Sequence, residues 1–343
     1  MKRATIADIA ARAGVSKSTV SHTLSGKRPI SLATQRRVRA VIEEVGYRPN
    51  VVAQRLAGGG HARNIGLVFP LSGSLIASTE TEFIVNAANA ANAADYTFLL
   101  LTHLAGNTTQ FERVVESGLV DGFVLMQVHM ADQRVERLRR EQIPFVLLGR
   151  CADNEGLAFV DVDIEAGITD AVTHLAEVGH RTIAYFALAD DDDFGFAVRA
   201  HARFQQQCAE HQITPLISDV QPTMEAAEAA CRTLLQERPE VSAILVRNKT
   251  MAAGIGRAAA SLGLQIPRDL ALIGMGGADH HLTLAQGPIG LTWIDIRAEL
   301  LAVTATQCLL AQLEGSAAGV QQRLITPYFI IGESSNTTAR DTQ

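Results

Sequence analysis

Hydrophobic residues follow two different patterns along the 343-residue chain. Before residue 48, apolar residues recur at the three- and four-residue spacing that is typical of amphipathic helices. From residue 64 onward, short apolar runs rich in β-branched residues alternate with helical stretches, and this alternation predicts an α/β body built on a doubly wound parallel sheet. The apolar runs are IGLVF (65–69), TFLLL (97–101), GFVLM (122–126), FVLLG (145–149), FVDV (159–162), TIAYF (182–186), SAILV (242–246) and LALIG (270–274).

The head before residue 48 has the start and stop signals of closely spaced helices. We expect Thr5 to cap the first helix, which ends at Gly14, and Ser16 to cap a second helix over residues 17–24. Val20 is the apolar wedge between the two helices, and the glycine supplies the positive φ that the tight turn needs. This spacing predicts a helix-turn-helix.

The exposed face of the second helix carries Lys17, Ser18, Ser21 and His22, with Thr19 near its edge. Short hydrogen-bonding side chains and two longer ones are suited to base edges and phosphates in a DNA major groove. The alternative is an ordinary solvated helix face. A third helix over 32–45 buries Val38, Val41, Ile42 and Val45, which completes a small core, and it presents Arg36, Arg37 and Arg39 to solvent.

Charge is distributed unevenly along the chain, and this favours the DNA interpretation. Residues 1–63 hold 12 Lys/Arg and 3 Asp/Glu, whereas the rest holds 18 and 33, which together give the formal net charge of −6. A basic head attracts polyanions, while an acidic body is repelled by them. The sequence therefore predicts that only the head binds nucleic acid.

Other features limit the location and the chemistry. No run of about 18 apolar residues is present, and the N-terminus lacks the apolar core of a signal peptide, so we expect a cytoplasmic protein with no membrane segment. The four cysteines, Cys151, Cys208, Cys231 and Cys308, show no paired spacing. We interpret them as reduced, buried thiols rather than as a disulfide framework or a zinc site.

The runs ATIADIAARAGVSKSTVSHTLSGKRPIS and TQRRVRAVIEEVGYRPNVVAQRLAGG resemble the headpiece and hinge of the lactose-repressor (LacI) family of bacterial transcription regulators. The similarity extends over essentially the whole chain. It implies a helix-turn-helix headpiece (1–48), a hinge helix and linker (49–63) and a two-lobed core like periplasmic sugar-binding proteins (64–343). It also implies a homodimer that binds a pseudo-palindromic operator and responds to a small molecule, with a sugar or glycoside favoured and a purine or another metabolite left open.

The hinge pattern agrees with this resemblance. Pro49 and Asn50 can start a helix and residues 58–60 are glycines that end it, although a flexible linker is the alternative. Eight residues are too few for a stable isolated helix, so its folding would depend on DNA. In the family a hinge leucine enters a minor-groove step, and Leu56 matches it. The DNA contacts we expect are Thr5, Ser16, Lys17, Ser18, Thr19, Ser21, His22, Ser31, Thr34, Asn50, Ala53, Gln54 and Leu56.

The resemblance implies effector contacts in a cleft between the lobes. The expected contacts are Arg199, Asn248, Asp163, Asp279 and Trp293, and for Arg199 and Asn248 the alternative is a surface or structural role. An ungapped match places Ala200, not Arg199, at the family's arginine. The family commonly has an aromatic and an acidic residue after the LALIG strand, but here the run is Met275-Gly276-Gly277-Ala278, and Asp279 follows it. Trp293 is either a stacking platform for a sugar ring or a core residue.

Enzymatic alternatives have weaker support. A sugar-kinase-like body would need a phosphate-cradling loop, and Gly254-Ile255-Gly256 lies within a helical pattern instead. Adjacent His280 and His281 beside Asp279 lack further metal ligands at a recognisable spacing. We therefore expect a ligand-controlled repressor with no enzymatic activity, metal or cofactor. A ligand-binding module with a vestigial head is the remaining alternative. The oligomeric state is a separate point: the polar C-terminus lacks leucine heptads, so we expect a dimer rather than a tetramer.

Overall fold

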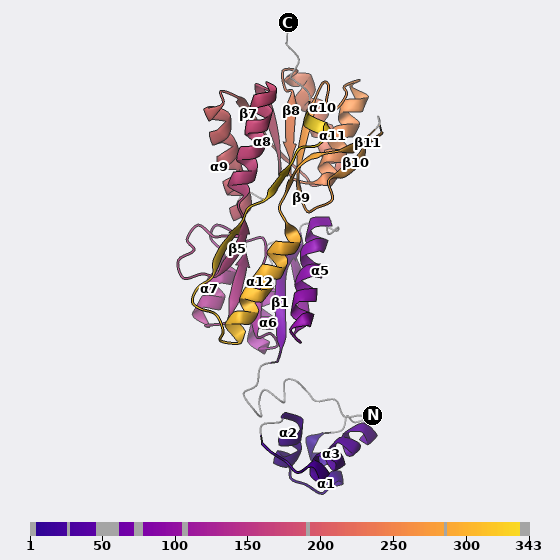
Figure 1. The fold of residues 1–343 in the computed structure, drawn as a ribbon, viewed down its shortest axis with the longest axis vertical. Helices are drawn as coiled ribbons and strands as arrows, with labels where there is room; N and C mark the ends of the chain where they lie inside the picture. The colour runs from indigo at the N-terminus through magenta and orange to yellow at the C-terminus, as the bar shows by residue number, and fades with distance from the viewer. Residues whose placement is uncertain are drawn as a thin grey trace. The chain divides into compact units, whose positions relative to one another are not determined.

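The computed structural model describes residues 5–25, 28–45, 62–71, 78–104, 109–189, 193–284 and 287–336. The chain divides into two compact units, Met1–Ala62 and Arg63–Gln343, which are shown in Figure 1 and described separately below. Four of the predicted DNA contacts lie outside the described residues: Asn50, Ala53, Gln54 and Leu56.

The first unit contains the predicted helices, α1 (Ile6–Ala13), α2 (Lys17–Ser25) and α3 (Leu32–Val45). Thr5 caps α1 through a capping box, because its side chain accepts from the Asp8 N–H while its own N–H donates to Asp8 Oδ2 over 2.8 Å. Gly14 ends the helix in the left-handed region at φ 62°. The predicted start and stop signals of α1 are therefore confirmed.

A small core holds these helices together. Its buried members are Ile9, Ala10, Ala13, Val20 and Val38. The prediction for α3 was partly wrong, since Val41, Ile42 and Val45 pack against this core but are only partly buried. Three short helices cannot enclose every apolar side chain, because a domain of this size has a high ratio of surface to volume.

The second unit has two lobes, each built on a six-stranded sheet within the described residues. The first sheet is entirely parallel in the order β13-β5-β4-β3-β1-β2. Its strands are β1 (Asn64–Leu71), β2 (Thr97–Leu104), β3 (Gly122–Leu125), β4 (Phe145–Leu148), β5 (Phe159–Val162) and β13 (Gln322–Ile325). Its helices are α5 (Ser78–Ala93), α6 (Thr109–Ser117), α7 (Gln133–Arg140) and α12 (Ala298–Leu313).

The second sheet has the order β14-β12-β9-β8-β6-β7, and only its edge strand β14 is antiparallel. Its strands are β6 (Thr182–Leu188), β7 (Thr214–Val220), β8 (Ala243–Val246), β9 (Ala271–Gly276), β12 (Thr292–Asp295) and β14 (Tyr328–Ile330). With it lie the hairpin β10 (His281–Leu284) and β11 (Gly287–Gly290), the short η1 (Glu333–Ser335), and the helices α8 (Ile164–Val178), α9 (Gly195–Glu210), α10 (Met224–Glu237) and α11 (Lys249–Ser261).

All eight predicted strands are present, as β1 to β6, β8 and β9. No pattern in the sequence predicted β7, the hairpin β10–β11, or the late strands β12, β13 and β14. Except for β12, whose four residues TWID are mostly buried, these strands lack the buried apolar run on which the prediction depended: β7 reads TPLISDV and β13 reads QRLI, and both have exposed residues. Edge strands need only one paired side, so they show a weak hydrophobic signal.

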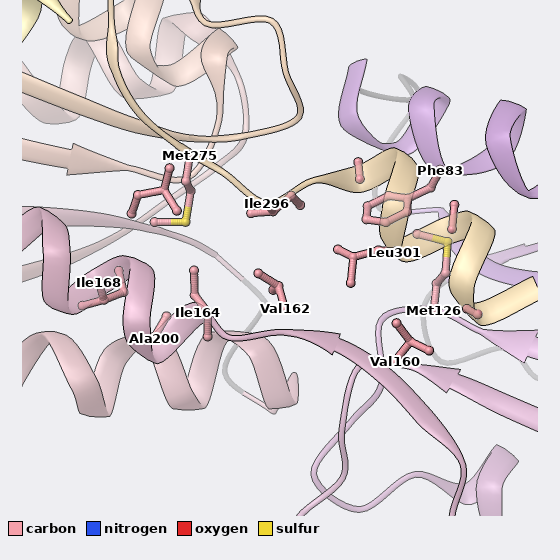
Figure 2. Close-up of a cluster of buried hydrophobic side chains, with 14 of the residues drawn as sticks. Phe83, Met126, Val160, Val162, Ile164, Ile168, Ala200, Met275, Ile296 and Leu301 are labelled. Atoms are coloured by element: carbon pink, nitrogen blue, oxygen red, sulfur yellow. The ribbon is translucent and has the colours of Figure 1, made fainter. Parts of the chain in front are cut away.

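The chain passes between the lobes three times, from β5 to α8, from β12 to α12 and from β13 to β14. One continuous hydrophobic cluster fills the region near these crossings, with Phe83 and Met126 from the first lobe and Met275 and Ile168 from the second (Figure 2). The lobes therefore share buried core at their junction.

Two further sequence predictions concern the whole chain. All four cysteines are free and buried, as predicted, and burial raises the pKa of Cys208 and Cys231 to about 12. None of the described helices combines the length and the apolar character needed to cross a bilayer.

Candidate functional site

The predicted DNA-reading face of α2 is on the surface of the first unit. Lys17 and Ser18 are exposed, and Thr19, Ser21 and His22 are half-buried. Ser16 caps the helix, since its Oγ accepts from the Thr19 N–H over 3.1 Å. Lys17 provides a positive charge at the first turn of α2, and the exposed hydroxyls provide hydrogen-bond donors and acceptors. Side chains of both kinds contact phosphates and base edges in DNA.

A similar hydroxyl pair begins α3. Ser31 Oγ accepts from the Thr34 N–H over 3.3 Å and lies 2.9 Å from Thr34 Oγ1. Helix N-termini bind anions through their backbone N–H groups and the helix dipole. Hydroxyls at the starts of α2 and α3, with exposed arginines along α3, thus give the first unit two groups of candidate phosphate contacts.

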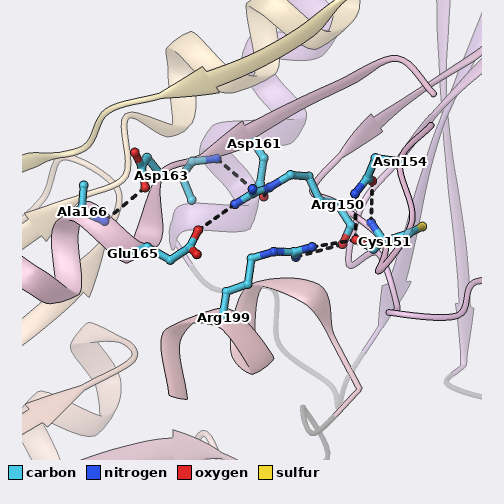
Figure 3. A network of polar contacts seen from close by, with 9 residues as sticks. Arg150, Cys151, Asn154, Asp161, Asp163, Glu165, Ala166 and Arg199 are labelled. Carbon is cyan, nitrogen blue, oxygen red and sulfur yellow. Dashed lines mark hydrogen bonds and ion pairs between the residues drawn. The ribbon is translucent and has the colours of Figure 1, made fainter. Parts of the chain in front are cut away.

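A second polar site lies between the lobes of the core, at the carboxyl ends of the strands, which is where open α/β sheets bind ligands. Arg150 follows β4, and its guanidinium donates to Asp161 Oδ2 over 2.8 Å and to Glu165 Oε2 over 3.1 Å (Figure 3). Burial opposes the charge of Arg150, but its hydrogen bonds to the two carboxylates raise its pKa. The guanidinium therefore remains a fixed cation.

Arg199 on α9 reaches from the second lobe to the first. Its two terminal nitrogens donate to the backbone carbonyls of Arg150 over 3.1 Å and of Cys151 over 2.6 Å (Figure 3). Burial, followed by the nearby charge of Arg150, lowers the pKa of Arg199. The structure thus places the predicted effector residue between the lobes, where its terminal nitrogens bond backbone rather than a carboxylate.

The start of α9 adds backbone contacts at the same junction. Phe194 forms an isolated β-bridge with His129, and the Gly195 N–H donates to the Val128 carbonyl over 2.9 Å. A side chain at Gly195 would meet the carbonyl oxygen of Arg150 at 2.0 Å, so only glycine permits this approach. The segment that carries Arg199 is therefore fixed to the first lobe.

Two predicted effector residues act as helix caps at strand ends. Asp163 follows β5, and its Oδ1 accepts from the Ala166 N–H over 3.1 Å at the start of α8. Asn248 follows β8, and its Oδ1 accepts from the Met251 N–H over 2.8 Å at the start of α11. The caps fix the orientation of both side chains at the carboxyl edges of the sheets.

The remaining two predicted effector residues have different environments. Asp279 is exposed and pairs with Lys249 Nζ at 2.5 Å, and this hydrogen bond lowers the pKa of Asp279. Trp293 is only 2% exposed, and its Nε1 donates to the Gly277 carbonyl over 2.8 Å. A Cβ at Gly274 would lie 2.1 Å from the indole, so the ring packs into the second lobe. Trp293 is therefore a core residue in this structure, and not an exposed stacking platform for a sugar ring.

Comparison with known proteins identifies the family. Residues 5–50 match the model for bacterial regulatory proteins of the lacI family, and residues 172–335 match the periplasmic binding protein-like domain. The HTH-type transcriptional regulator AglR of Rhizobium meliloti (strain 1021) is 31% identical over 266 residues, which cover 76% of this chain and 74% of that protein. The chain belongs to the lacI family of bacterial regulatory proteins.

Solved structures of lacI-family proteins have the same fold. A complex of the transcriptional regulator CelR with cellobiose matches with a TM-score of 0.69 and 25% identity, covering 97% of this chain and all of that one. A lac repressor dimer bound to operator and the anti-inducer ONPF matches with a TM-score of 0.81 and 24% identity, covering 97% and 99%. The predicted headpiece and two-lobed core are confirmed, and the chain is a helix-turn-helix transcription regulator.

Sequence reasoning missed three polar residues at the lobe junction of this lacI-family regulator: Thr79, Glu82 and Arg150. Arg150 comes directly after a predicted buried strand, so its position alone could have marked it. Thr79 and Glu82 gave no such signal, because Thr79 contacts Gly277 from 198 positions away along the chain.

Proposed function

We propose that this lacI-family regulator is a cytoplasmic homodimer that binds a pseudo-palindromic operator, and that a sugar or glycoside bound between the lobes controls this binding. Repression is relieved by the ligand, and the protein catalyses no reaction and needs no cofactor. The observation that carries the proposal is the combination of a complete helix-turn-helix with a two-lobed core that has polar groups from both lobes at its junction.

The DNA part of the proposal rests on the charge and the surface of the head. Lys17, Ser18 and His22 read major-groove edges, while hydroxyls at the starts of α2 and α3 hold phosphates. Two subunits present two such helices, which suits an operator with two half-sites. The net positive charge of residues 1–63 supplies the sequence-independent attraction.

The effector part rests on the chemistry of the lobe junction. Arg199, Asp163 and Asn248 bring a guanidinium fork, a carboxylate and an amide to the strand ends of the two sheets. Such groups bond pairs of hydroxyls, and the related CelR binds cellobiose. A ligand with different affinities for two lobe arrangements shifts the population between them, and through linkage it changes the affinity for DNA.

A binding selection from a random duplex library tests the DNA part. We expect the full chain to enrich an inverted repeat, and we expect Lys17→Ala to bind that repeat more weakly with less loss on random DNA. An equal loss on both would make Lys17 a phosphate contact. Failure of the native chain to enrich any sequence would contradict the proposal.

A thermal-shift series tests the effector part, with cellobiose, maltose, D-glucose, D-glucose 6-phosphate and hypoxanthine as probes. A specific ligand at about one hundred times its Kd adds roughly 2.7 kcal/mol of stability. We expect at least one neutral sugar to raise Tm and to weaken binding to the selected repeat. A rise in Tm with hypoxanthine alone would mean that the effector is a purine rather than a sugar.

A further inference from the structure

The first turns of α5 reach across the lobe junction to the end of β9. Thr79 and Glu82 are three positions apart and so lie on one face of the helix. Thr79 Oγ1 accepts from the Gly277 N–H over 3.0 Å, and the carboxylate of Glu82 accepts from the backbone N–H of Ala278. A hydroxyl and a carboxylate from the first lobe are thereby fixed at the carboxyl end of a strand in the second.

The carboxylate of Glu82 lies where a side chain at Gly277, just after β9, would otherwise be. A Cβ at Gly277 would lie 2.1 Å from Glu82 Oε2, and one at Gly276 would lie 3.0 Å from Thr79 Oγ1. Residues 276–278 are Gly, Gly and Ala, and therefore bring no polar side chain of their own. The acidic group at this strand end comes from the opposite lobe.

The surroundings of Glu82 favour neutral hydrogen-bond donors as its ligands. Burial raises the pKa of Glu82, the Ala278 N–H lowers it, and the charges of Asp295 and Glu299 raise it further. A carboxylate offers about four acceptor positions, so one backbone donor leaves most of its capacity for other partners. Hydroxyl groups can fill these positions, whereas an anion would be repelled by the three carboxylates.

We infer that Glu82 is a specificity-determining residue of the effector site, where its carboxylate accepts hydrogen bonds from hydroxyls of a neutral polyol. This inference rests on the proposed function and narrows its ligand class, because it excludes phosphorylated sugars. A ligand bonded to Glu82 also touches the point where α5 meets β9. Binding there is coupled directly to the arrangement of the two lobes.

The test measures the affinity of the full chain for cellobiose, maltose, D-glucose and D-glucose 6-phosphate by calorimetry. Glu82→Gln keeps the side-chain shape and an acceptor for the Ala278 N–H but removes the charge. Because hydrogen bonds to charged groups are stronger than neutral ones, we expect Kd for the best neutral sugar to rise about 10- to 100-fold. The matched control is Glu116→Gln on the exposed face of α6, where we expect no change in Kd.

The outcomes separate the inference from the proposed function. If the native chain binds a neutral sugar and the Glu82→Gln variant binds it equally well, the inference about Glu82 is overturned while the proposed function stands. A preference of the native chain for D-glucose 6-phosphate would also overturn it. No binding of any probe by the native chain would refute the sugar effector, and the inference with it.

A second variant covers the case in which Glu82→Gln fails to fold. Glu82→Asp keeps the charge but shortens the reach, so we expect weaker sugar binding with the preference for neutral sugars retained. Unchanged affinity in that variant would show that the position of the carboxylate does not matter, and would overturn the inference.

Discussion

Single side chains hold the two lobes of the core together through backbone atoms. Arg199 bonds the carbonyls of Arg150 and Cys151, and Thr79 bonds the N–H of Gly277. The residue types alone do not show this, since an arginine beside two carboxylates would be expected to pair with them. Asp161 and Glu165 instead pair with Arg150, and Arg199 is left to bridge the lobes.

Removing the Arg199 side chain should therefore weaken the core. We expect Arg199→Ala to lower the free energy of unfolding by about 2–4 kcal/mol, since two half-buried carbonyls lose a charged donor. Urea unfolding measures this as a lower midpoint with an unchanged m-value. Arg140→Ala, on the exposed end of α7, is the control. Equal midpoints for the two variants would mean that the inter-lobe bonds contribute nothing.

His180 makes the stability of the core depend on pH. Burial lowers its pKa to about 4, and its Nδ1 lies 2.8 Å from Ser242 Oγ. Because the folded pKa lies below the unfolded value near 6.5, protons bind the unfolded chain more tightly, so this contribution to stability is present at pH 7 and is lost as the pH falls toward 4.

Between pH 7 and pH 5 we expect His180 to lower the free energy of unfolding by about 2 kcal/mol. His180→Asn keeps a polar group near Ser242 but does not titrate, so its stability should change less over the same range. Denaturant unfolding at each pH provides the measurement. Parallel pH curves for the native chain and the variant would show that His180 does not carry the dependence.

At the scale of elements, local signals predicted some features and tertiary contacts decided others. The caps and the glycine stop of α1 follow from hydrogen bonding within a few residues, so the sequence was sufficient. β7 and β13 form because a neighbouring strand offers a free edge, and no local pattern records that. Trp293 was ambiguous for the same reason, because only the packed structure shows the indole filling the space beside Gly274.

The caps of individual helices give a matched pair of variants. Thr5 caps α1 in the first unit, and Thr223 caps α10 in the second through the Ala226 N–H at 3.2 Å. Each alanine substitution should cost about 1 kcal/mol, with the effect confined to its own unit. Hydrogen exchange on the full chain should show faster exchange in α1 for Thr5→Ala and in α10 for Thr223→Ala. Faster exchange in α10 of the Thr5→Ala variant would contradict this independence.

For the whole molecule, the sequence predicted the two-part organisation, the family and the placing of polar residues at strand ends. The organisation follows from charge and from runs of apolar residues, which are local properties. The family follows from the resemblance of the headpiece and hinge motifs, and that resemblance implied the effector residues. The hydrogen-bond partners of Arg199 and the contact of Glu82 with the end of β9 depend on how the two lobes meet. The carbonyls that Arg199 bonds lie 48 and 49 positions earlier in the sequence. Sequence patterns do not encode such distances, so the candidate effector residues could be named but not their contacts.

The charge asymmetry leads to a final prediction about the intact protein. Since residues 1–63 carry the excess of basic residues and the body is acidic, DNA affinity should come from the head alone and should fall steeply with salt. Replacing Arg36, Arg37 and Arg39 by alanine should weaken binding to all duplexes uniformly and make the slope of log K against log salt shallower by up to about three.

Fluorescence anisotropy with a labelled random duplex at several salt concentrations measures that slope. Arg232→Ala on α10 is the control, because it removes a basic residue from the acidic body and should leave the slope unchanged. A shallower slope in the control would place phosphate contacts on the body. Because the acidic body should repel DNA, the two sets of variants together decide whether the phosphate contacts lie on the head alone.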